Sequence, residues 1–198
     1  MRLILASSSK NRKKIFDNIG WKYEIIKSTK EEYSEATDPR EYVMDLSRDK
    51  ANNVASQIEG KALIIAADSI VYMDGHIFEK PKTKEEAFNN IKLMSGKASY
   101  LTTGVTIKDL YQDKEITFSD AVEVHLREVD DEDIKWYVDN ENVFTGCGYT
   151  IPGKGEIFVD KIIGDFNTMF GISISAVYAK LKELGYSMKD FDMKNNVK

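Results

Sequence analysis

Residues 62–72 of the chain read ALIIAADSIVY. A short, almost continuous apolar run of this kind predicts a buried β-strand. Asp68 stands inside the run, and burying its carboxylate costs on the order of several kcal/mol unless the group is paired, bound to a metal or placed at the open end of the strand. Charged groups are found at buried positions most often in catalytic sites. Asp68 is therefore the first candidate for catalysis, and the alternative is a strand cap or a buried ion pair.

The patterns around this strand alternate between strand and helix at first and then become rich in strands. Asp38 is predicted to cap a long helix with Pro39 at its first position, and Asp74-Gly75 to form a hairpin turn. The polar residues 29–37 are predicted to form a loop. Strands are predicted over residues 2–6, 23–27, 62–72, 100–108, 115–126 and 156–163, and helices over residues 11–19, 39–57, 83–94, 130–139 and 175–184. This order predicts a mixed α/β fold with an extended sheet and flanking helices.

The composition is that of an ordinary globular protein, with 42% hydrophobic and 31% charged residues among 198. Neither a repeat nor a Pro/Gly/Ser-rich linker divides the chain, which predicts one domain over residues 1–187 and a polar tail over residues 188–198. Cys147 is the only cysteine, so an internal disulfide and zinc sites built on several cysteines are excluded. The N-terminal apolar run is too short for a signal peptide and no run is long enough to span a membrane, so we expect a cytoplasmic protein.

Charge is spread unevenly along a chain whose net charge is -5. Residues 1–30 hold eight Lys and Arg against two carboxylates, a local charge of +6, and residues 109–145 hold twelve carboxylates against three basic residues, a local charge of -9. An acidic protein with a concentrated basic segment favours a small anionic ligand over a nucleic acid. The alternative is a non-catalytic regulator that binds nucleotides or nucleic acid through the basic segment.

Three serines follow the first predicted strand and precede a helix that carries two basic residues. Backbone N–H groups and the dipole at a helix N-terminus favour anions. The hydroxyls of Ser7 and Ser8 add small donors, and Arg12 and Lys13 add positive charge suited to phosphate. The alternative is a solvated, capped helix with basic residues on its surface.

Lys50 lies in the middle of an apolar stripe on the long predicted helix, which Val43, Leu46 and Val54 form. A charged side chain on the core face of a helix needs a partner, and a phosphate or Asp68 would serve. The alternative is that the lysine stem lies along the apolar surface with its ammonium in water.

Two weaker signals lie in predicted loops. Lys80 precedes Pro81, which restricts it to an extended conformation that could aim its ammonium inward. Glu31 and Glu32 form a carboxylate pair of the kind that holds Mg²⁺ together with substrate phosphates. Both signals also fit solvated loop residues. Combined with the serines, the cations and Asp68, they match the set of groups that binds a metal-bound polyphosphate and attacks it with water.

Taken in order, the chain resembles the Maf family of nucleotide pyrophosphatases over about residues 2 to 185. The matching pieces are Leu3-Ile4-Leu5-Ala6-Ser7-Ser8-Ser9 with Arg12, Glu41-Tyr42-Val43, Lys50-Ala51, Ala67-Asp68-Ser69-Ile70-Val71, Lys80-Pro81, Met94-Ser95-Gly96, Thr103-Gly104-Val105, Trp136-Tyr137-Val138, Gly148-Tyr149 and Gly164-Asp165-Phe166-Asn167. The resemblance implies an elongated mixed β-sheet with flanking helices and two lobes around a central cleft, as in inosine triphosphatases. It also implies hydrolysis of nucleoside triphosphates to the monophosphate and pyrophosphate, in nucleotide-pool housekeeping, with Mg²⁺ or Mn²⁺ and with a homodimer as one option.

The resemblance also assigns roles to residues of this chain. Asp68 corresponds to the base that activates water and is expected to contact the metal, and Glu32 corresponds to the acidic loop residue that shares it. The residues expected to bind the substrate are Ser7, Ser8, Arg12, Lys13, Lys50, Ser69 and Lys80.

Three positions depart from or vary within the family pattern. Asn11 stands where an arginine is usual, Pro152 stands where Gln or Glu is usual, and Ser69 replaces the common threonine. The stretch Gly146-Cys147-Gly148 differs from the usual Ala-Gly-Ala. This combination of usual and unusual residues leaves the preference for a nucleotide base open, with a lean toward dTTP and UTP. An alternative is a pyrophosphatase that acts on modified nucleotides.

Overall fold

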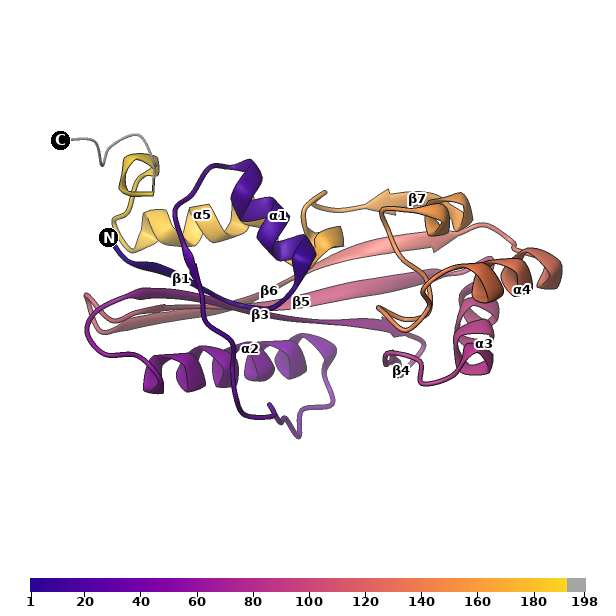
Figure 1. The fold of residues 1–198 in the computed structure, drawn as a ribbon, viewed down its shortest axis with the longest axis horizontal. Helices are drawn as coiled ribbons and strands as arrows, with labels where there is room; N and C mark the ends of the chain where they lie inside the picture. The colour runs from indigo at the N-terminus through magenta and orange to yellow at the C-terminus, as the bar shows by residue number, and fades with distance from the viewer. Residues whose placement is uncertain (192–198) are drawn as a thin grey trace. The chain divides into compact units, whose positions relative to one another are not determined.

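The computed structural model describes residues 1–191 of the chain (Figure 1). Within these residues a seven-stranded sheet has the order β2-β1-β3-β5-β6-β7, with β4 paired to β3 outside this path. The strands are β1 (Leu3–Ala6), β2 (Glu24–Ile25), β3 (Leu63–Met73), β4 (His76–Phe78), β5 (Ala98–Asp109), β6 (Lys114–Leu126) and β7 (Val159–Ile163). The helices are α1 (Lys10–Asn18), α2 (Pro39–Ser56), α3 (Lys84–Met94), α4 (Asp131–Asn140) and α5 (Ile174–Glu183), with short 3₁₀ turns η1 (Lys154–Phe158), η2 (Thr168–Phe170) and η3 (Met188–Asp190). The predicted mixed α/β fold with an extended sheet and flanking helices is confirmed.

The chain divides into two compact units, each built from several segments. The first contains Met1–Ser69, Thr103–Asp120 and the chain from Phe166 onward, and the second contains Ile70–Thr102 and Ala121–Asp165. Neither unit is a continuous stretch, because β3, β5 and β6 each contribute residues to both.

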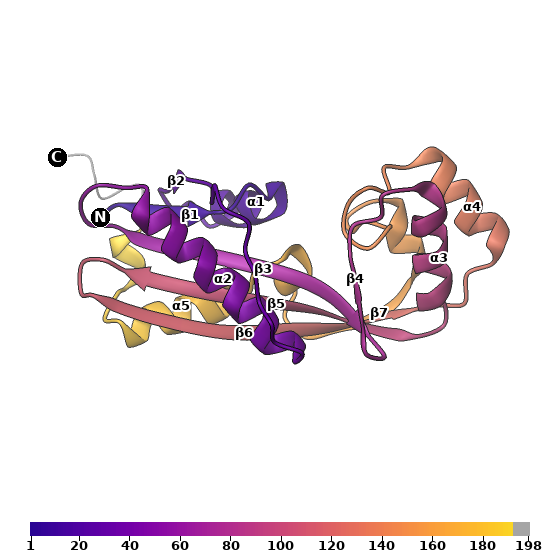
Figure 2. The same cartoon turned by 90° about the horizontal axis from the view of Figure 1, so that it is seen from below.

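In the first unit, helices cover both faces of the sheet. Figures 1 and 2 show α1 and α5 on one face and α2 on the other. The α1 and α5 face is packed by Leu3, Leu5, Ile15, Phe16, Leu63, Ile65, Ala67, Val177 and Leu181, and the α2 face by Ile4, Ala6, Ala51, Val54, Ile64 and Ala66. Odd-numbered residues of β1 and β3 therefore face α1 and α5, and even-numbered residues face α2, as the period of two in a strand requires.

Helix α2 approaches the sheet closely at Gly104. A Cβ atom added to Gly104 would lie 2.1 Å from the carbonyl oxygen of Val43. A glycine in β5 at this point lets the first half of α2 pack backbone to backbone against the strand. This close approach fixes the position of the later turns of α2, which carry Lys50.

The start of α2 and the predicted hairpin follow local sequence rules. Asp38 caps α2 by accepting from the backbone N–H groups of Arg40 and Glu41 at 2.9 and 3.0 Å. Asp74 and Gly75 both have positive φ, at 52° and 83°, which suits the two central residues of a tight turn between β3 and β4. Both predictions are confirmed.

In the second unit, α3 and α4 lie side by side (Figure 2). Their buried residues include Ile91, Met94, Ile134 and Tyr137. The prediction of a strand from residue 156 was wrong for its first residues, because residues 154–158 form the 3₁₀ turn η1 and β7 begins at Val159. Burial of Phe158 against the Tyr137 ring, at a centroid distance of 5.0 Å, favours the turn over an extended path.

The C-terminal part of the described chain packs against the first unit. Phe191 is 3% exposed, and its ring stacks on Trp21 at a centroid distance of 4.5 Å. The polar tail predicted over residues 188–198 therefore includes one residue that packs on the core, Phe191, and residues 192–198 lie outside the described residues. The division into a domain over residues 1–187 and a tail stays a prediction.

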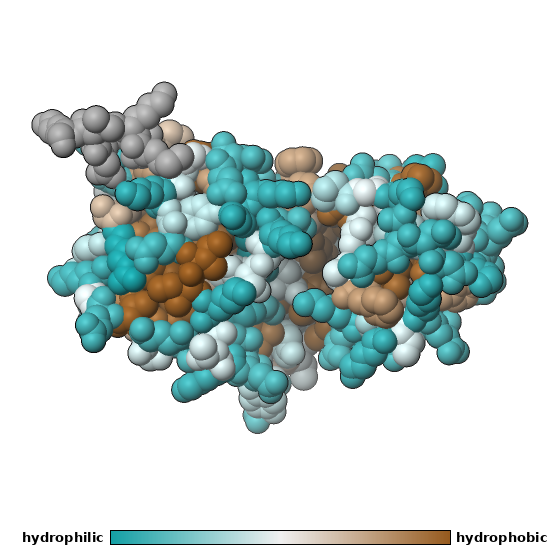
Figure 3. Space-filling view, viewed as in Figure 1, coloured by the Kyte–Doolittle hydropathy of each residue, from teal (hydrophilic) through white to brown (hydrophobic). Residues whose placement is uncertain are grey.

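The surface is mostly hydrophilic on the face drawn in Figure 3, with a hydrophobic patch over the region of β1. Strand β2 forms the edge of the sheet beside β1, and Ile25 in β2 is 42% exposed. Among the described residues, no helix combines the length and the hydropathy needed to cross a membrane.

The substitution Gly104→Ala is expected to lower the free energy of unfolding by about 3 kcal/mol, because the new methyl group overlaps backbone atoms of α2 that cannot rotate away. Gly60→Ala is the control, since a Cβ atom there meets nothing within 4 Å and only its positive φ of 79° is strained, at about 1 kcal/mol. Urea unfolding measures both values. Equal losses for the two variants would contradict the close approach.

Candidate functional site

The site is built just beyond the end of β1, beside the middle of its parallel neighbour β3. Strand β1 pairs in parallel with β3, and Ala6 lies opposite Ala66. Ser7 follows Ala6 directly, so it lies level with the segment Ala67–Ser69. Because side chains alternate along β3, Asp68 points to the α2 face and Ser69 to the α1 face. One strand therefore delivers a carboxylate to one helix and a hydroxyl to another.

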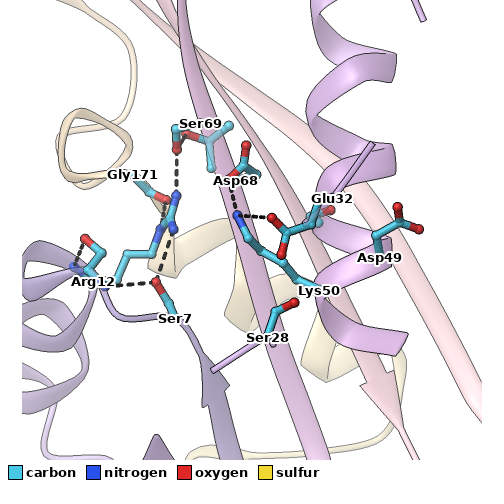
Figure 4. Close-up of polar contacts among 12 residues, drawn as sticks. Ser7, Arg12, Ser28, Glu32, Asp49, Lys50, Asp68, Ser69 and Gly171 are labelled. Carbon is cyan, nitrogen blue, oxygen red and sulfur yellow. Dashed lines mark hydrogen bonds and ion pairs between the residues drawn. The ribbon is translucent and has the colours of Figure 1, made fainter. Parts of the chain in front are cut away.

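On the α2 face, Lys50 joins two carboxylates (Figure 4). Its ammonium donates to Asp68 Oδ1, and Glu32 Oε2 lies 3.8 Å from the same nitrogen. The three side chains are each about one fifth exposed, at 20%, 19% and 20% for Lys50, Glu32 and Asp68. The predicted partnership of Lys50 with Asp68 is confirmed. The ion pair offsets the desolvation of Asp68 while leaving the carboxylate within reach of solvent.

On the α1 face, Arg12 is held by three hydrogen bonds from three parts of the chain (Figure 4). Its Nε donates to the carbonyl oxygen of Gly171 at 2.8 Å, Nη1 to Ser7 Oγ at 3.2 Å, and Nη2 to Ser69 Oγ at 2.8 Å. The arginine is only 8% exposed. A guanidinium has five N–H groups, so within residues 1–191 these bonds leave one N–H on each terminal nitrogen for a ligand.

The partners of the Ser7 hydroxyl show in which direction its hydrogen bonds run. Ser7 Oγ accepts from Arg12 and from the backbone N–H of Ser9 at 3.2 Å, and both partners can only donate. Its own hydrogen is therefore available to donate, and among the described residues the structure gives it no acceptor. Ser69 Oγ also exchanges a hydrogen bond with Thr103 Oγ1 at 2.8 Å. An anion at the end of β1 would accept the Ser7 hydrogen.

The start of α1 strengthens this preference for an anion. Ser9 caps the helix, accepting the backbone N–H of Arg12 at 3.4 Å. Burial lowers the pKa of Arg12 from its usual range, and the nearby charge of Asp68 opposes that shift. The charges of Arg12 and Asp68 therefore interact, although the two side chains lie on opposite faces of β3.

Other predicted residues lie outside these contacts. Ser8 and Lys13 are exposed near the start of α1, and within residues 1–191 neither bonds to Arg12 or to Asp68. Lys80 is exposed in the second unit, after β4. Their roles in substrate binding stay predictions. Pro152 also belongs to the second unit, and Asn11 lies in the first turn of α1.

A polar hollow of about 290 Å³ lies beside Glu32. Its lining is Ser28, Lys30, Glu31, Glu32, Asp49, Asn52, Asn53 and Ser56, all within the first unit. Glu32 lines this hollow, and it also contacts Lys50, as Figure 4 shows. Anionic and amide oxygens lining a hollow are suited to hard cations and to water.

Asp68 and Glu32 are oxygen donors of the kind that divalent cations take. Among the described residues, no group of three or more His, Cys, Asp and Glu side chains could hold a metal ion. Mg²⁺ is commonly held by one or two carboxylates, with substrate phosphates and water completing its shell. Asp68 and Glu32 both approach the ammonium of Lys50 and so supply this smaller set.

Covalent catalysis by the only cysteine is disfavoured. Burial raises the pKa of the Cys147 thiol to about 12, so the nucleophilic thiolate is scarce near neutral pH. Cys147 also belongs to the second unit.

Comparison with known proteins identifies the family. Residues 2–184 match the family model described as Maf-like protein. The chain belongs to this family. The Maf-like relatives include the dTTP/UTP pyrophosphatase of Carboxydothermus hydrogenoformans, which is 37% identical over 94% of this chain and 100% of its own length. The dTTP/UTP pyrophosphatase of Caldanaerobacter subterraneus subsp. tengcongensis is 36% identical over 92% of this chain and 88% of its own.

Solved structures extend the likeness in fold beyond the Maf-like family. The Ham1 protein of Staphylococcus aureus gives a TM-score of 0.52 at 11% identity over 93% of this chain and all of its own. A HAM1 protein from Coxiella burnetii gives 0.54 at 13% identity, over 92% of this chain and 99% of its own. At these identities the likeness concerns the fold alone.

Two residues of the site had no role assigned from the sequence. Thr103 lies in a segment that matches the Maf-like family, but no sequence rule paired its hydroxyl with Ser69. Gly171 contributes a backbone carbonyl, and a carbonyl leaves no signal in residue type. Both contacts join β3 or α1 to segments more than 30 residues away along the chain.

Replacing Arg12 with methionine is expected to lower the free energy of unfolding by about 2–4 kcal/mol, because it leaves buried acceptors without a donor. Arg2→Met is the matched control, since Arg2 makes an ion pair with Glu24 at the surface and surface pairs contribute little. Thermal and urea unfolding of both variants measure the difference. A loss for Arg12→Met no larger than that for Arg2→Met would show that the three bonds are weak.

Proposed function

We propose that this protein hydrolyses nucleoside triphosphates to the nucleoside monophosphate and pyrophosphate. The observation that carries the proposal is the delivery by β3 of Asp68 and Ser69 to opposite faces, which brings a carboxylate base and an anion-binding group into one site. Maf-like relatives named dTTP/UTP pyrophosphatase at 36–37% identity support the same reaction.

Binding of the triphosphate uses donors that the protein has left free. The hydrogen of Ser7, the N-terminus of α1 and the two remaining N–H groups of Arg12 converge on the end of β1. Lys50 adds a point charge on the other face of β3 and can exchange its bond to Asp68 for a phosphate oxygen. These groups orient the chain of phosphates before reaction, which is a large part of catalysis of phosphoryl transfer.

Asp68 is the general base of the proposed reaction. It takes a proton from a water molecule as the water oxygen bonds to the α-phosphorus, and the bond from that phosphorus to the α–β bridging oxygen breaks. The pyrophosphate leaves with the electron pair of that bond and is stabilised by Arg12 and Lys50. A divalent cation such as Mg²⁺ or Mn²⁺, held by Asp68 and Glu32, would neutralise phosphate charge when bound.

The proposed substrates are dTTP and UTP, since these are named for the relatives at 36–37% identity and the sequence leans the same way. Asn11 and Pro152 depart from the family pattern, so a modified nucleotide is the second candidate substrate. A role in nucleotide-pool housekeeping in the cytoplasm follows from the proposed reaction. A homodimer is a further proposal, which sedimentation would test.

A regulator that only binds nucleic acid is less well supported. Its main argument was the basic segment of residues 1–30. In the first unit, Arg2 pairs with Glu24 and Arg12 is buried among hydroxyls and a carbonyl. Two of the basic side chains are thus already engaged, which favours a small anionic ligand.

Purified protein with Mg²⁺ or Mn²⁺ is expected to convert dTTP and UTP to monophosphate and pyrophosphate, and Asp68→Asn is expected to lower kcat by at least about 10²-fold because the amide cannot accept the proton. Asp139→Asn is the control, since Asp139 is an exposed partner of Lys84 and Lys135. Chromatography of the products and circular dichroism of both variants provide the measurement. Turnover by folded Asp68→Asn at the parent rate would refute the assigned base.

Glu32→Gln is expected to raise the Mg²⁺ concentration for half-maximal rate by about tenfold, because it removes one of two charged oxygen ligands. Glu35→Gln, on the same loop but exposed, is the control. Titration of activity with Mg²⁺ after treatment with a chelator measures both. Unchanged metal dependence in Glu32→Gln would remove Glu32 from the proposed metal site.

A further inference from the structure

Gly171 lies so close to the buried guanidinium of Arg12 that a side chain there would make a tight contact. Its carbonyl accepts from Arg12 Nε at 2.8 Å. A Cβ atom added to Gly171 would lie 3.2 Å from Nε, 3.3 Å from Nη2 and 3.4 Å from Ser69 Oγ. The glycine backbone has a φ of 91°, in the left-handed region. Absence of a side chain at this position therefore lets the backbone approach the guanidinium without displacing it.

The turn that carries Gly171 is anchored away from Arg12. Gly171 closes the 3₁₀ turn η2, with its N–H donating to the carbonyl of Thr168 at 2.9 Å. Thr168 is fully buried, and its hydroxyl donates to Asp120 Oδ2 at 2.8 Å. The bond to β6 thus helps to set the position of the Gly171 carbonyl, together with the packing of η2 against α1.

This anchored carbonyl determines how the guanidinium is turned. A planar guanidinium with Nε bound at one edge has its terminal nitrogens fixed in direction. Ser7 and Ser69 then bind one N–H on each terminal nitrogen. The three contacts together therefore determine the direction of the two remaining N–H groups of Arg12.

We propose that Gly171 is a positioning residue for the substrate's phosphates, acting through Arg12. The phosphate ligand rests on the proposed function, whereas the contact of Gly171 with Arg12 does not. A side chain at residue 171 would shift the guanidinium by a few tenths of an ångström and misalign the two N–H groups that bind phosphate. Ser69 would be affected less, since the same Cβ atom would lie 3.4 Å from its hydroxyl, an ordinary van der Waals distance.

Gly185 provides a matched control for this substitution. Its φ is 90°, nearly the same as at Gly171, but a Cβ atom there meets nothing within 4 Å. It lies in the same unit, directly after α5 and its C-cap Leu184. Gly171→Ala and Gly185→Ala therefore share the backbone strain and differ in the contact with Arg12.

The first measurement is the dissociation constant of the α,β-imido analogue of dTTP, determined by calorimetry. This analogue resists cleavage between the α- and β-phosphates. Gly171→Ala is expected to raise the dissociation constant about tenfold, the effect of a weakened charge-assisted contact, and Gly185→Ala to change it less than about twofold. With dTTP as substrate, the same pattern is expected in KM, with a smaller change in kcat, because a phosphate contact acts in ground and transition states alike.

A double-mutant cycle tests whether the effect passes through Arg12. In an Arg12→Met background, Gly171→Ala is expected to add less than about a twofold change in the dissociation constant. A tenfold addition in that background would overturn the proposal, as would equal effects of Gly171→Ala and Gly185→Ala in the parent. Absence of binding by the parent would overturn it as well.

The outcomes for the two proposals can be separated. Binding of the analogue with the expected pattern, but no pyrophosphate from any triphosphate, would refute the proposed reaction and leave the role of Gly171 intact. Turnover by the parent with equal behaviour of the two alanine variants would refute the role of Gly171 alone.

Discussion

The parallel pairing of β1 with β3 is the constraint on which the rest of the site depends. It brings Ser7, which follows the end of β1, beside the part of β3 that carries Asp68 and Ser69. The alternation of β3 then sends Asp68 toward α2 and Ser69 toward α1. A shift of the register by one residue would exchange the two faces and separate Asp68 from Lys50. The full burial of Ile64, Ile65, Ala66 and Ala67 makes such a shift costly, so the hydrophobic core fixes the chemistry.

The two faces of β3 balance charge in different ways. On the α2 face, partly exposed carboxylates share one ammonium, an arrangement that a metal and a phosphate can rearrange. On the α1 face, a buried guanidinium is fixed by two hydroxyls and a carbonyl and can turn little. A rigid anion-binding group beside an adaptable ion pair suits a reaction in which phosphate charge moves while the leaving group stays bound.

The sequence was informative where local rules apply. The apolar run around Asp68, the cap at Asp38 and the lysine within the apolar stripe of α2 predicted a strand, a helix start and an ion pair that the structure contains. The alternative prediction, that Asp68 forms an ion pair, is also confirmed, because Lys50 donates to it. This ion pair is compatible with a role of Asp68 as a base. These signals depend on periodicity and residue type, which the sequence carries directly.

The remaining features depend on distant contacts. The first residues of the predicted strand at 156–163 became a 3₁₀ turn because Phe158 packs on Tyr137. The bond between Gly171 and Arg12 spans 159 positions and involves a backbone carbonyl, so no spacing rule indicates it. Arg12 was predicted from the sequence to contact phosphate, but its burial and its three protein partners became evident only from the fold.

The central claim is that the groups on both faces of β3 bind one nucleotide. The most direct measurement is a titration of isotopically labelled protein with the α,β-imido analogue of dTTP in the presence of Mg²⁺, followed by backbone amide resonances. The account predicts that the amides of residues 7–13 and those of Lys50, Asp68 and Ser69 shift together with a single dissociation constant. Shifts confined to one face of β3, or two different dissociation constants for the two faces, would contradict it.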